Sequence, residues 1–171
     1  MDTSTSARDA YNPEFLAAVE RVLDNEGGYS SSLADPGGAT KFGISARSYP
    51  GLDIATLTRD AAVKIYWSEW WLRFGFAQLP GAIAAKTFDL AVNMGAAHAI
   101  ACLQRALRAC GLPVTEDGAL GPATTLASRR ADPGALMAAL RSELAAHYRM
   151  VASNQKRGAA FLKGWLNRAY A

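Results

Sequence analysis

Residues 20–44 read ERVLDNEGGYSSSLADPGGATKFGI, and the rest of the chain is organised around them. A helical pattern ends at Glu26, directly before two glycines that stop it. Asp35 follows nine residues later inside a glycine-rich turn, and Thr40 comes five residues after that. Cleavage of a glycosidic bond needs a protonated acid for the leaving oxygen and a second group that holds water or stabilises the cationic sugar. Two carboxyl groups and a hydroxyl at this spacing are candidates for that chemistry.

This stretch and several later ones resemble a known family. The sequences EGGY at 26–29 and DPGGATKFGIS at 35–45 resemble the signature of glycoside hydrolase family 108, which contains phage-type muramidases that cut the sugar strand of peptidoglycan. The resemblance covers nearly the whole chain after about residue 12. Its later motifs resemble the C-terminal peptidoglycan-binding region of that family: LQRAL at 103–107, DGALGPAT at 117–124 and GWLNR at 164–168. One departure is the sequence SSL at 31–33, where the family pattern has Asn-Asp-Pro.

The resemblance implies catalytic roles for three residues. Glu26 is expected to be the general acid, because the C-terminal end of a helix and apolar neighbours both raise the pKa of a carboxyl group. Asp35 either manages the attacking water and the cationic transition state, or is a turn aspartate bonded to its own backbone. Thr40 either orients that water or is bonded to backbone in a β-lobe. A carboxyl separation of about 6.5–9.5 Å would indicate inversion, and about 5 Å retention.

Five further residues are candidates for binding the glycan. Tyr29 and Tyr49 either line the cleft or pack in the core or on the surface. Trp70 belongs to a tryptophan-rich run and either stacks on a sugar ring or packs in the interior. Asp89 and Asn93 lie one helical turn apart. They either bind the amide groups of the sugars or cap and bridge neighbouring backbone.

Length and composition limit the architecture. A chain of 171 residues is long enough to bury a core and short enough for one domain. We expect a flexible N-terminus over 1–11 and a single domain over 12–171, with a catalytic half at 12–79 and a helical half at 80–171. Half of the residues are hydrophobic, and the formal net charge is +3. A basic protein is attracted to polyanions such as anionic wall polymers, but no dense Lys/Arg cluster favours nucleic acid.

The N-terminus predicts where the protein is made. Residues 1–12 are polar and lack the apolar region of a Sec-type signal peptide. No run approaches the roughly 20 apolar residues of a membrane span. Taken with the family resemblance, this predicts an enzyme made in the cytoplasm that acts in the periplasm or cell wall. It would cross the inner membrane through a phage holin or a secretion system.

The two cysteines do not indicate a disulfide or a metal site. Cys102 and Cys110 lie eight residues apart in a predicted helix. At about 1.5 Å rise per residue they would be about 12 Å apart, which is too far for a disulfide bond. No metal-type spacing surrounds them. We therefore predict that both cysteines are reduced and lie in the core, and we expect no metal or cofactor.

Helical periodicity accounts for most of the chain. The predicted helices are 13–26, 58–73, 81–93, 97–110, 122–130, 133–153 and 159–169. The inward face of the second is expected to hold Ala62, Ile65, Tyr66 and Trp70, and that of the last Phe161, Leu162, Trp165 and Leu166. Residues 29–46 lack this periodicity and predict a β-hairpin or irregular β-lobe. The predicted fold is therefore all-α with a minor β part, namely a lysozyme-like helical domain with a small β-lobe.

The leading hypothesis is a monomeric peptidoglycan muramidase. It would hydrolyse the β-1,4 bond between N-acetylmuramic acid and N-acetylglucosamine, with glycan strands as partner and neither nucleic acid nor membrane insertion involved. One alternative is a lytic transglycosylase, which uses a single glutamate and forms an anhydro product. The other is a non-catalytic peptidoglycan-binding or secretion-accessory protein on the same scaffold.

Overall fold

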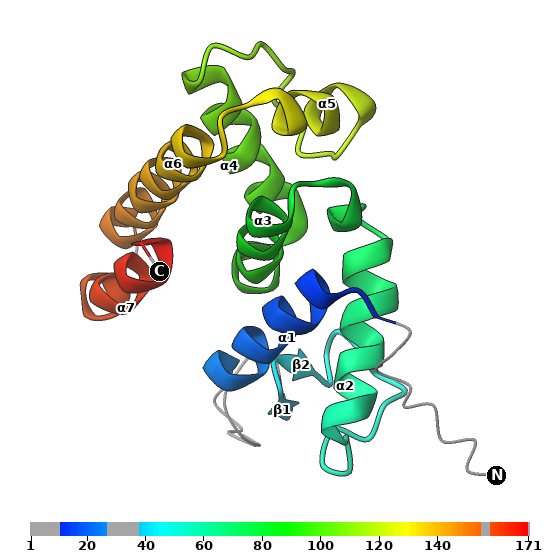
Figure 1. The fold of residues 1–171 in the computed structure, drawn as a ribbon. Helices are drawn as coiled ribbons and strands as arrows, with labels where there is room; N and C mark the ends of the chain where they lie inside the picture. The colour runs from blue at the N-terminus through cyan, green and yellow to red at the C-terminus, as the bar shows by residue number, and fades with distance from the viewer. Residues whose placement is uncertain (1–10, 27–37, 155–157, 171) are drawn as a thin grey trace, which may run out of the picture. The chain divides into compact units, whose positions relative to one another are not determined.

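A computed structural model describes residues 11–26, 38–154 and 158–170, without the side chains of Asn25 and Glu26 (Figure 1). Within these segments the chain forms seven α-helices, one π-helical segment, one 3-10 turn and a sheet of two short strands. The predicted fold class, a lysozyme-like helical fold with a minor β part, is confirmed.

The chain divides into two compact units between Asn93 and Met94. The first unit holds helices α1 to α3 and the small sheet, and the second holds helices α4 to α7. Each unit has its own buried residues, described below. The prediction of one domain over 12–171 stays a prediction.

Helix α1 (Pro13–Glu26) opens the first unit with the expected cap. The backbone N–H of Phe15 donates to the side-chain oxygen of Asn12 at 2.8 Å, which satisfies one of the donors that a helix start leaves unpaired. The apolar face is also as predicted, since Phe15, Val19 and Val22 are fully buried. The predicted helix and its end at Glu26 are confirmed.

Helix α2 (Arg59–Ile65) begins at the predicted cap, where the Thr58 hydroxyl accepts from the Ala61 N–H at 3.2 Å. The chain then continues as a π-helical segment, η2 (Tyr66–Leu72). A π-helix places residues five apart on the same face, so Tyr66 and Trp71 are both buried. The sequence predicted Trp70 at the inner position, but Trp70 is only half-buried and Trp71 occupies the core.

Aromatic rings fill the core of the first unit. The rings of Phe15, Trp71 and Phe88 meet edge to face, with centroids 5.4–6.0 Å apart. Phe76, from the 3-10 turn η3 (Phe76–Gln78), joins them at 5.9 Å from Phe88. Such contacts add to the stability that burial of the rings provides. Phe88 lies on α3 (Gly81–Met94), the helix predicted to be central to the core.

Strands β1 (Thr40–Lys41) and β2 (Ile44–Ser45) form an antiparallel hairpin, the described part of the predicted β-lobe. Its two-residue loop has positive φ at both central positions, +54° at Phe42 and +77° at Gly43. These values define the turn type whose twist matches that of paired strands. Phe42 is the only non-glycine residue with positive φ among the residues described here.

The second unit is a helical assembly of α4 (Ala96–Ala109), α5 (Pro122–Arg130), α6 (Pro133–Asn154) and α7 (Gly158–Tyr170). Figure 1 shows α6 lying beside α4 and α7, and these two pairs make the main helix contacts of the unit. The core is lined by side chains that recur every three or four residues: Ile100, Leu103, Leu107, Leu136, Leu140 and Leu144. All four helices were predicted to within one or two residues at their ends.

One predicted face of the second unit is wrong. Phe161 on α7 was expected to point inward, but its side chain is 56% exposed. Trp165 is half-buried, and the buried residues of α7 are Gly158 and Ala169. Both cysteines are free, as predicted; Cys102 is buried, and Cys110 is only half-buried.

Candidate functional site

Glu26 is the last residue of α1, so its backbone lies at the helix end that the sequence predicted. Its side chain lies outside the described part of the structure, as do the whole of Tyr29 and Asp35. The roles of these three residues, and the separation of the two carboxyl groups, therefore stay predictions.

Thr40 lies on the hairpin next to the segment that contains Asp35. It pairs with Ser45 across the hairpin, and its hydroxyl donates one long hydrogen bond, 3.4 Å, to the carbonyl of Gly38. The hydroxyl is at a solvent-accessible position, so it can also bond to water. The backbone is held more firmly, because the Ala46 N–H donates to the Ala39 carbonyl at 2.9 Å.

Contacts with the helices fix the hairpin and the end of α1. The Tyr66 hydroxyl donates to the Phe42 carbonyl at 2.8 Å and ties the hairpin turn to η2. The Arg59 guanidinium pairs with Glu20 and, at 3.4 Å, with Asp24, which joins the start of α2 to the second half of α1. The hydrogen bond with Glu20 raises the pKa of Arg59, so the cation persists at every physiological pH. These contacts hold the backbone on both sides of residues 27–37.

Tyr49 and Trp70, two predicted glycan-binding residues, are half-buried in the first unit. The backbone N–H of Tyr49 donates to the Ser45 carbonyl at 3.0 Å, so Tyr49 follows the hairpin directly. The ring centroid of Trp70 lies 6.2 Å from that of Tyr66, the residue that anchors the hairpin turn. Both side chains thus keep some accessible surface close to the hairpin.

Asp89 and Asn93 lie on the second half of α3, where Asp89 is half-buried and Asn93 is exposed. Both have interaction partners within the protein. Both alternatives, a bridging role and contact with sugar amides, stay predictions.

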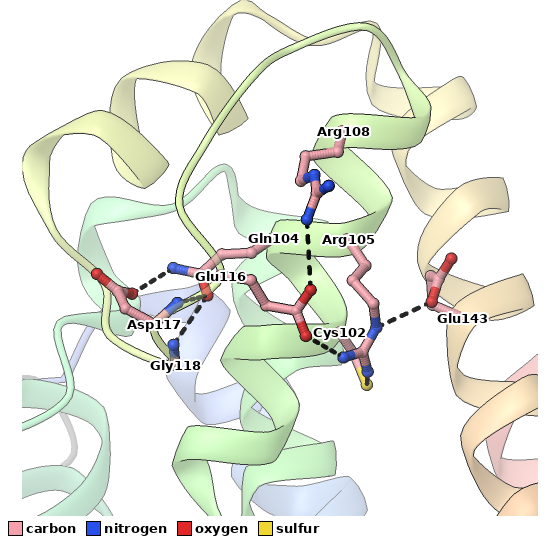
Figure 2. A network of polar contacts seen from close by, with 8 residues as sticks. All are labelled: Cys102, Gln104, Arg105, Arg108, Glu116, Asp117, Gly118 and Glu143. Atoms are coloured by element: carbon pink, nitrogen blue, oxygen red, sulfur yellow. Dashed lines mark hydrogen bonds and ion pairs between the residues drawn. The ribbon is translucent and has the colours of Figure 1, made fainter.

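A polar network in the second unit was not predicted from the sequence (Figure 2). The Gln104 side chain is fully buried on α4. Its amide nitrogen donates to the Asp117 carboxylate at 2.7 Å, to the Ala119 carbonyl at 3.0 Å and to the Thr124 hydroxyl at 3.2 Å. Its oxygen accepts from the N–H groups of Asp117 at 3.1 Å and Gly118 at 2.9 Å. One side chain therefore holds the loop that carries the DGALGPAT motif.

The loop also passes too close to α4 for any residue except glycine at position 118. Gly118 has a φ of +70°, and a Cβ there would lie 2.9 Å from the Ala97 carbonyl oxygen. A glutamine in an apolar helix, followed 13 residues later by Asp-Gly, is the sequence signal that could have revealed the network.

Beside Gln104, Arg105 forms the centre of an ion-pair cluster. Its guanidinium pairs with Glu116 and, at 3.1 Å, with Glu143 on α6, and it contacts the Cys102 sulfur at 3.1 Å (Figure 2). Arg108 reaches Glu116 at 3.5 Å. Burial raises the pKa of the Cys102 thiol, although the nearby guanidinium opposes this rise. The thiol therefore stays protonated and poorly nucleophilic.

A search of the described residues was made for groups able to hold a metal ion. Across the described segments, no three His, Cys, Asp or Glu side chains come together to hold a metal ion. A search of the described helices for one long and apolar enough to cross a membrane finds none. The candidate site is therefore the part of the first unit between the end of α1, the hairpin and η2.

Comparison with known families finds a match for each of the two units. Residues 19–95 match the family described as glycosyl hydrolase 108, and residues 98–170 match the family described as a predicted peptidoglycan domain. The chain joins a region that matches glycosyl hydrolase 108 to a region that matches a predicted peptidoglycan domain. The resemblance noted from the sequence motifs is confirmed. The matches change over at residues 95–98, close to the boundary between the compact units at residues 93 and 94.

A solved structure agrees with this assignment. The chain is similar to the protein in "Structure of Brucella abortus SagA", with a TM-score of 0.75 and 28% sequence identity. The similarity covers 91% of this chain and 89% of that one, so it includes both regions. Among curated protein sequences, none matches the chain significantly.

All predicted site residues lie in the glycosyl hydrolase 108 region, and the Gln104 network lies in the predicted peptidoglycan domain. The first region matches a glycosyl hydrolase family, and the second matches a family described as a predicted peptidoglycan domain. The coarse conclusion is a protein that acts on peptidoglycan through a hydrolase region.

Proposed function

We propose that the protein is a peptidoglycan muramidase that hydrolyses the β-1,4 bond between N-acetylmuramic acid and N-acetylglucosamine. The observation that carries the proposal is the joining of a glycosyl hydrolase 108 region to a predicted peptidoglycan domain in one chain. A glycoside hydrolase region needs a sugar–sugar bond, and peptidoglycan supplies such bonds along its glycan strands. The substrate class follows from the pair of regions more strongly than from either alone.

Glu26 is the proposed general acid. Its position as the last residue of α1 supports this role, because the partial negative charge at a helix C-terminus disfavours a carboxylate and so raises the pKa of the carboxyl group. A raised pKa keeps a proton available for the leaving oxygen at neutral pH. The proton would pass to the oxygen that leaves with N-acetylglucosamine as the bond to C1 of N-acetylmuramic acid breaks.

Asp35 and Thr40 are proposed to manage the water that attacks C1. The accessible Thr40 hydroxyl, which donates a long hydrogen bond of 3.4 Å to the Gly38 carbonyl, supports a role in orienting water. Asp35 would accept the proton of that water or stabilise the cationic sugar. Tyr29, Tyr49, Trp70, Asp89 and Asn93 are proposed to contact the glycan, with the partial exposure of Tyr49 and Trp70 in favour.

Action on peptidoglycan requires the protein to reach the cell wall. We propose that it is made in the cytoplasm and reaches the periplasm through a holin or a secretion system, and that it works as a monomer. The predicted peptidoglycan domain supports the destination and does not distinguish the routes.

The test is mass spectrometry of soluble fragments released from purified peptidoglycan by the wild type and by Glu26→Gln. Glutamine keeps the size of the side chain and removes the transferable proton, so a folded variant without activity assigns the acid. We expect the wild type to release fragments with reducing muramic ends, and Glu26→Gln to release at least about 10²-fold less.

Each other outcome selects a different function. Anhydro-muramic ends would identify a lytic transglycosylase. Reducing N-acetylglucosamine ends would place the cleavage at the other glycosidic bond of the strand. Absence of fragments with intact binding to the wall would leave a non-catalytic peptidoglycan-binding protein.

A further inference from the structure

Three aromatic rings of the second unit stack from the core to the solvent. Tyr148 on α6 is buried, Trp165 on α7 is half-buried, and Phe161 on α7 is 56% exposed. The Tyr148 and Trp165 centroids are 5.7 Å apart with the ring planes 22° from parallel. The Trp165 and Phe161 centroids are 5.9 Å apart at 26°. The outermost ring of this stack is thus supported from below and open to solvent.

This arrangement differs from the aromatic core of the first unit. There the phenyl, phenol and indole rings meet at interplanar angles of 48° or more, as is typical of aromatic packing in an interior. In the second unit, by contrast, the Phe161 and Trp165 ring planes lie 26° from parallel, and Phe161 is 56% exposed. The exposed part of the Phe161 ring is apolar surface available for contact with a ligand.

A glycine beside the exposed ring also favours a ligand-binding surface here. Gly164 lies one helical turn after Phe161, on the same face of α7. A Cβ at Gly164 would meet nothing within 4 Å, so no internal contact requires a glycine there. Glycine inside a helix is less stable than alanine. It leaves an open strip of backbone beside the ring, where a flat ligand can approach.

The charge of α7 fits an acidic ligand. The helix carries Lys163 and Arg168 and no acidic residue. The stem peptides of peptidoglycan end in carboxylates, and the lactyl group of N-acetylmuramic acid carries another carboxyl position. Attraction between a cationic helix and this polymer favours encounter at low ionic strength.

We propose that Phe161, Trp165 and Gly164 form a glycan-binding platform in the predicted peptidoglycan domain. The apolar C–H face of an N-acetyl amino sugar in a β-1,4-linked strand lies on the outer face of Phe161, where the electron-rich ring attracts it. Trp165 holds Phe161 in this orientation, and Gly164 leaves room for the neighbouring sugar. The inference rests on the proposed function only for the identity of the ligand.

The test measures co-sedimentation of the full-length protein with purified, insoluble peptidoglycan. It is carried out in the Glu26→Gln background on ice, so that cleavage does not remove the ligand. Phe161→Leu keeps an apolar side chain and removes the ring, whereas Phe161→Ser removes both. Leu126→Ser is the matched control, because Leu126 is an equally exposed apolar residue of the same unit, at 57%.

We expect both Phe161 variants to bind roughly five- to tenfold more weakly, since stacking on an aromatic face is lost. Leu126→Ser should bind as the background protein does. Gly164→Ala should raise the melting temperature by about 2–4 °C and yet weaken binding. A gain in stability combined with a loss of binding is not explained by misfolding.

Three outcomes would overturn the proposal. If Phe161→Leu and Gly164→Ala both bind peptidoglycan as strongly as the background protein, the proposed platform does not exist. An equal loss with Leu126→Ser would indicate general hydrophobic adsorption. Size-exclusion chromatography that shows a dimer lost on Phe161→Ser, with peptidoglycan binding unchanged, would assign the face to self-association.

Failure of the platform and failure of the proposed function give different results. Fragment release that depends on Glu26, with binding independent of Phe161, would reject the platform alone. Binding that depends on Phe161, without fragment release by the wild type, would reject the muramidase and keep the platform.

Discussion

The hydroxyl of Tyr66 donates a 2.8 Å hydrogen bond to the carbonyl of Phe42. Tyr66 is buried at the start of η2, and Phe42 is the first residue of the hairpin turn. The bond therefore links the aromatic core of the glycosyl hydrolase 108 region to the hairpin that carries Thr40. The following predictions test this link and four others.

Tyr66→Phe removes the hydroxyl and leaves the half-buried Phe42 carbonyl without this donor. We expect the free energy of unfolding to fall by about 1 kcal/mol and the melting temperature by about 2–4 °C. Hydrogen exchange at the backbone amides of residues 42–46 should also quicken. Tyr170→Phe, at a position 51% exposed, is the control and should change neither quantity. An unchanged exchange rate in the hairpin would show that the bond does not hold it.

Thr40→Val removes the hydroxyl and keeps the shape of the side chain. Because the hydrogen bond from the hydroxyl to the Gly38 carbonyl is long, at 3.4 Å, the free energy of unfolding should change by less than about 0.5 kcal/mol. Fragment release from peptidoglycan should fall by about 10²-fold if the hydroxyl orients water, and Thr40→Ser should restore most of it. Full activity in Thr40→Val would assign Thr40 a structural role in the hairpin.

Gly43→Ala places a Cβ in a backbone conformation with φ of +77°. We expect it to destabilise the protein by about 1–2 kcal/mol, because L-residues other than glycine are strained in that region. The matched control is Gly51→Ala, where a Cβ would meet nothing within 4 Å and φ is not positive. Chemical denaturation that finds the two variants equally stable would contradict the turn geometry.

The Asp117 carboxylate contributes to stability in a pH-dependent way. The hydrogen bond from Gln104 and the backbone N–H of Ala119 hold the pKa of Asp117 below its ordinary value of 3.8. Because this pKa is lower in the folded than in the unfolded state, the carboxylate stabilises the folded protein fully above pH 3.8. This stabilisation is lost as the pH falls through the pKa of the folded state. Asp117→Asn keeps an acceptor but no charge, so it should be less stable than wild type at pH 6, with a smaller difference near pH 2. A pH-independent difference would contradict this.

The His147 side chain is a base, unlike the Asp117 carboxyl group, but its contribution to stability also falls as the pH falls. Burial lowers the pKa of His147 below 6.5, and the charges of His98 and Arg105 lower it further. Below pH 6.5 the unfolded chain therefore takes up a proton that the folded protein resists, and stability falls as the pH falls through this window. His147→Gln should flatten the stability profile between pH 7.5 and 5. An NMR titration of the wild-type imidazole that gives a value at or above 6.5 would refute the mechanism.

Local signals predicted most of the helices. Asn12 and Thr58 are capping residues whose side chains accept backbone N–H bonds in the structure, so the starts of α1 and α2 were readable from residue type. The inner residue of η2 was not. Both Trp70 and Trp71 are large and apolar, and only the π-helical spacing from Tyr66 selects Trp71 for the core. Periodicity arguments assume α-helical spacing and therefore choose the wrong one.

Long-range pairing explains what else the sequence did not reveal. Gln104 meets Asp117 across 13 residues, and helical periodicity and turn residues do not by themselves determine a pairing over that distance. The exposure of Phe161 depends in the same way on which face of α7 meets α6. The candidate site was located by motif, and the separation of Glu26 and Asp35 is a three-dimensional quantity that spacing along the chain does not determine.

The Gln104 network also affects how the protein ages chemically. Asp-Gly sequences are prone to spontaneous rearrangement, because the glycine nitrogen attacks the aspartate carboxyl carbon to form a succinimide. Here the Gly118 N–H is held at 2.9 Å by the Gln104 oxygen, and the Asp117 carboxylate is held at 2.7 Å by the Gln104 nitrogen. Both reacting groups are thus restrained by one side chain. We therefore expect this rearrangement to be slower in the folded protein than in the unfolded chain.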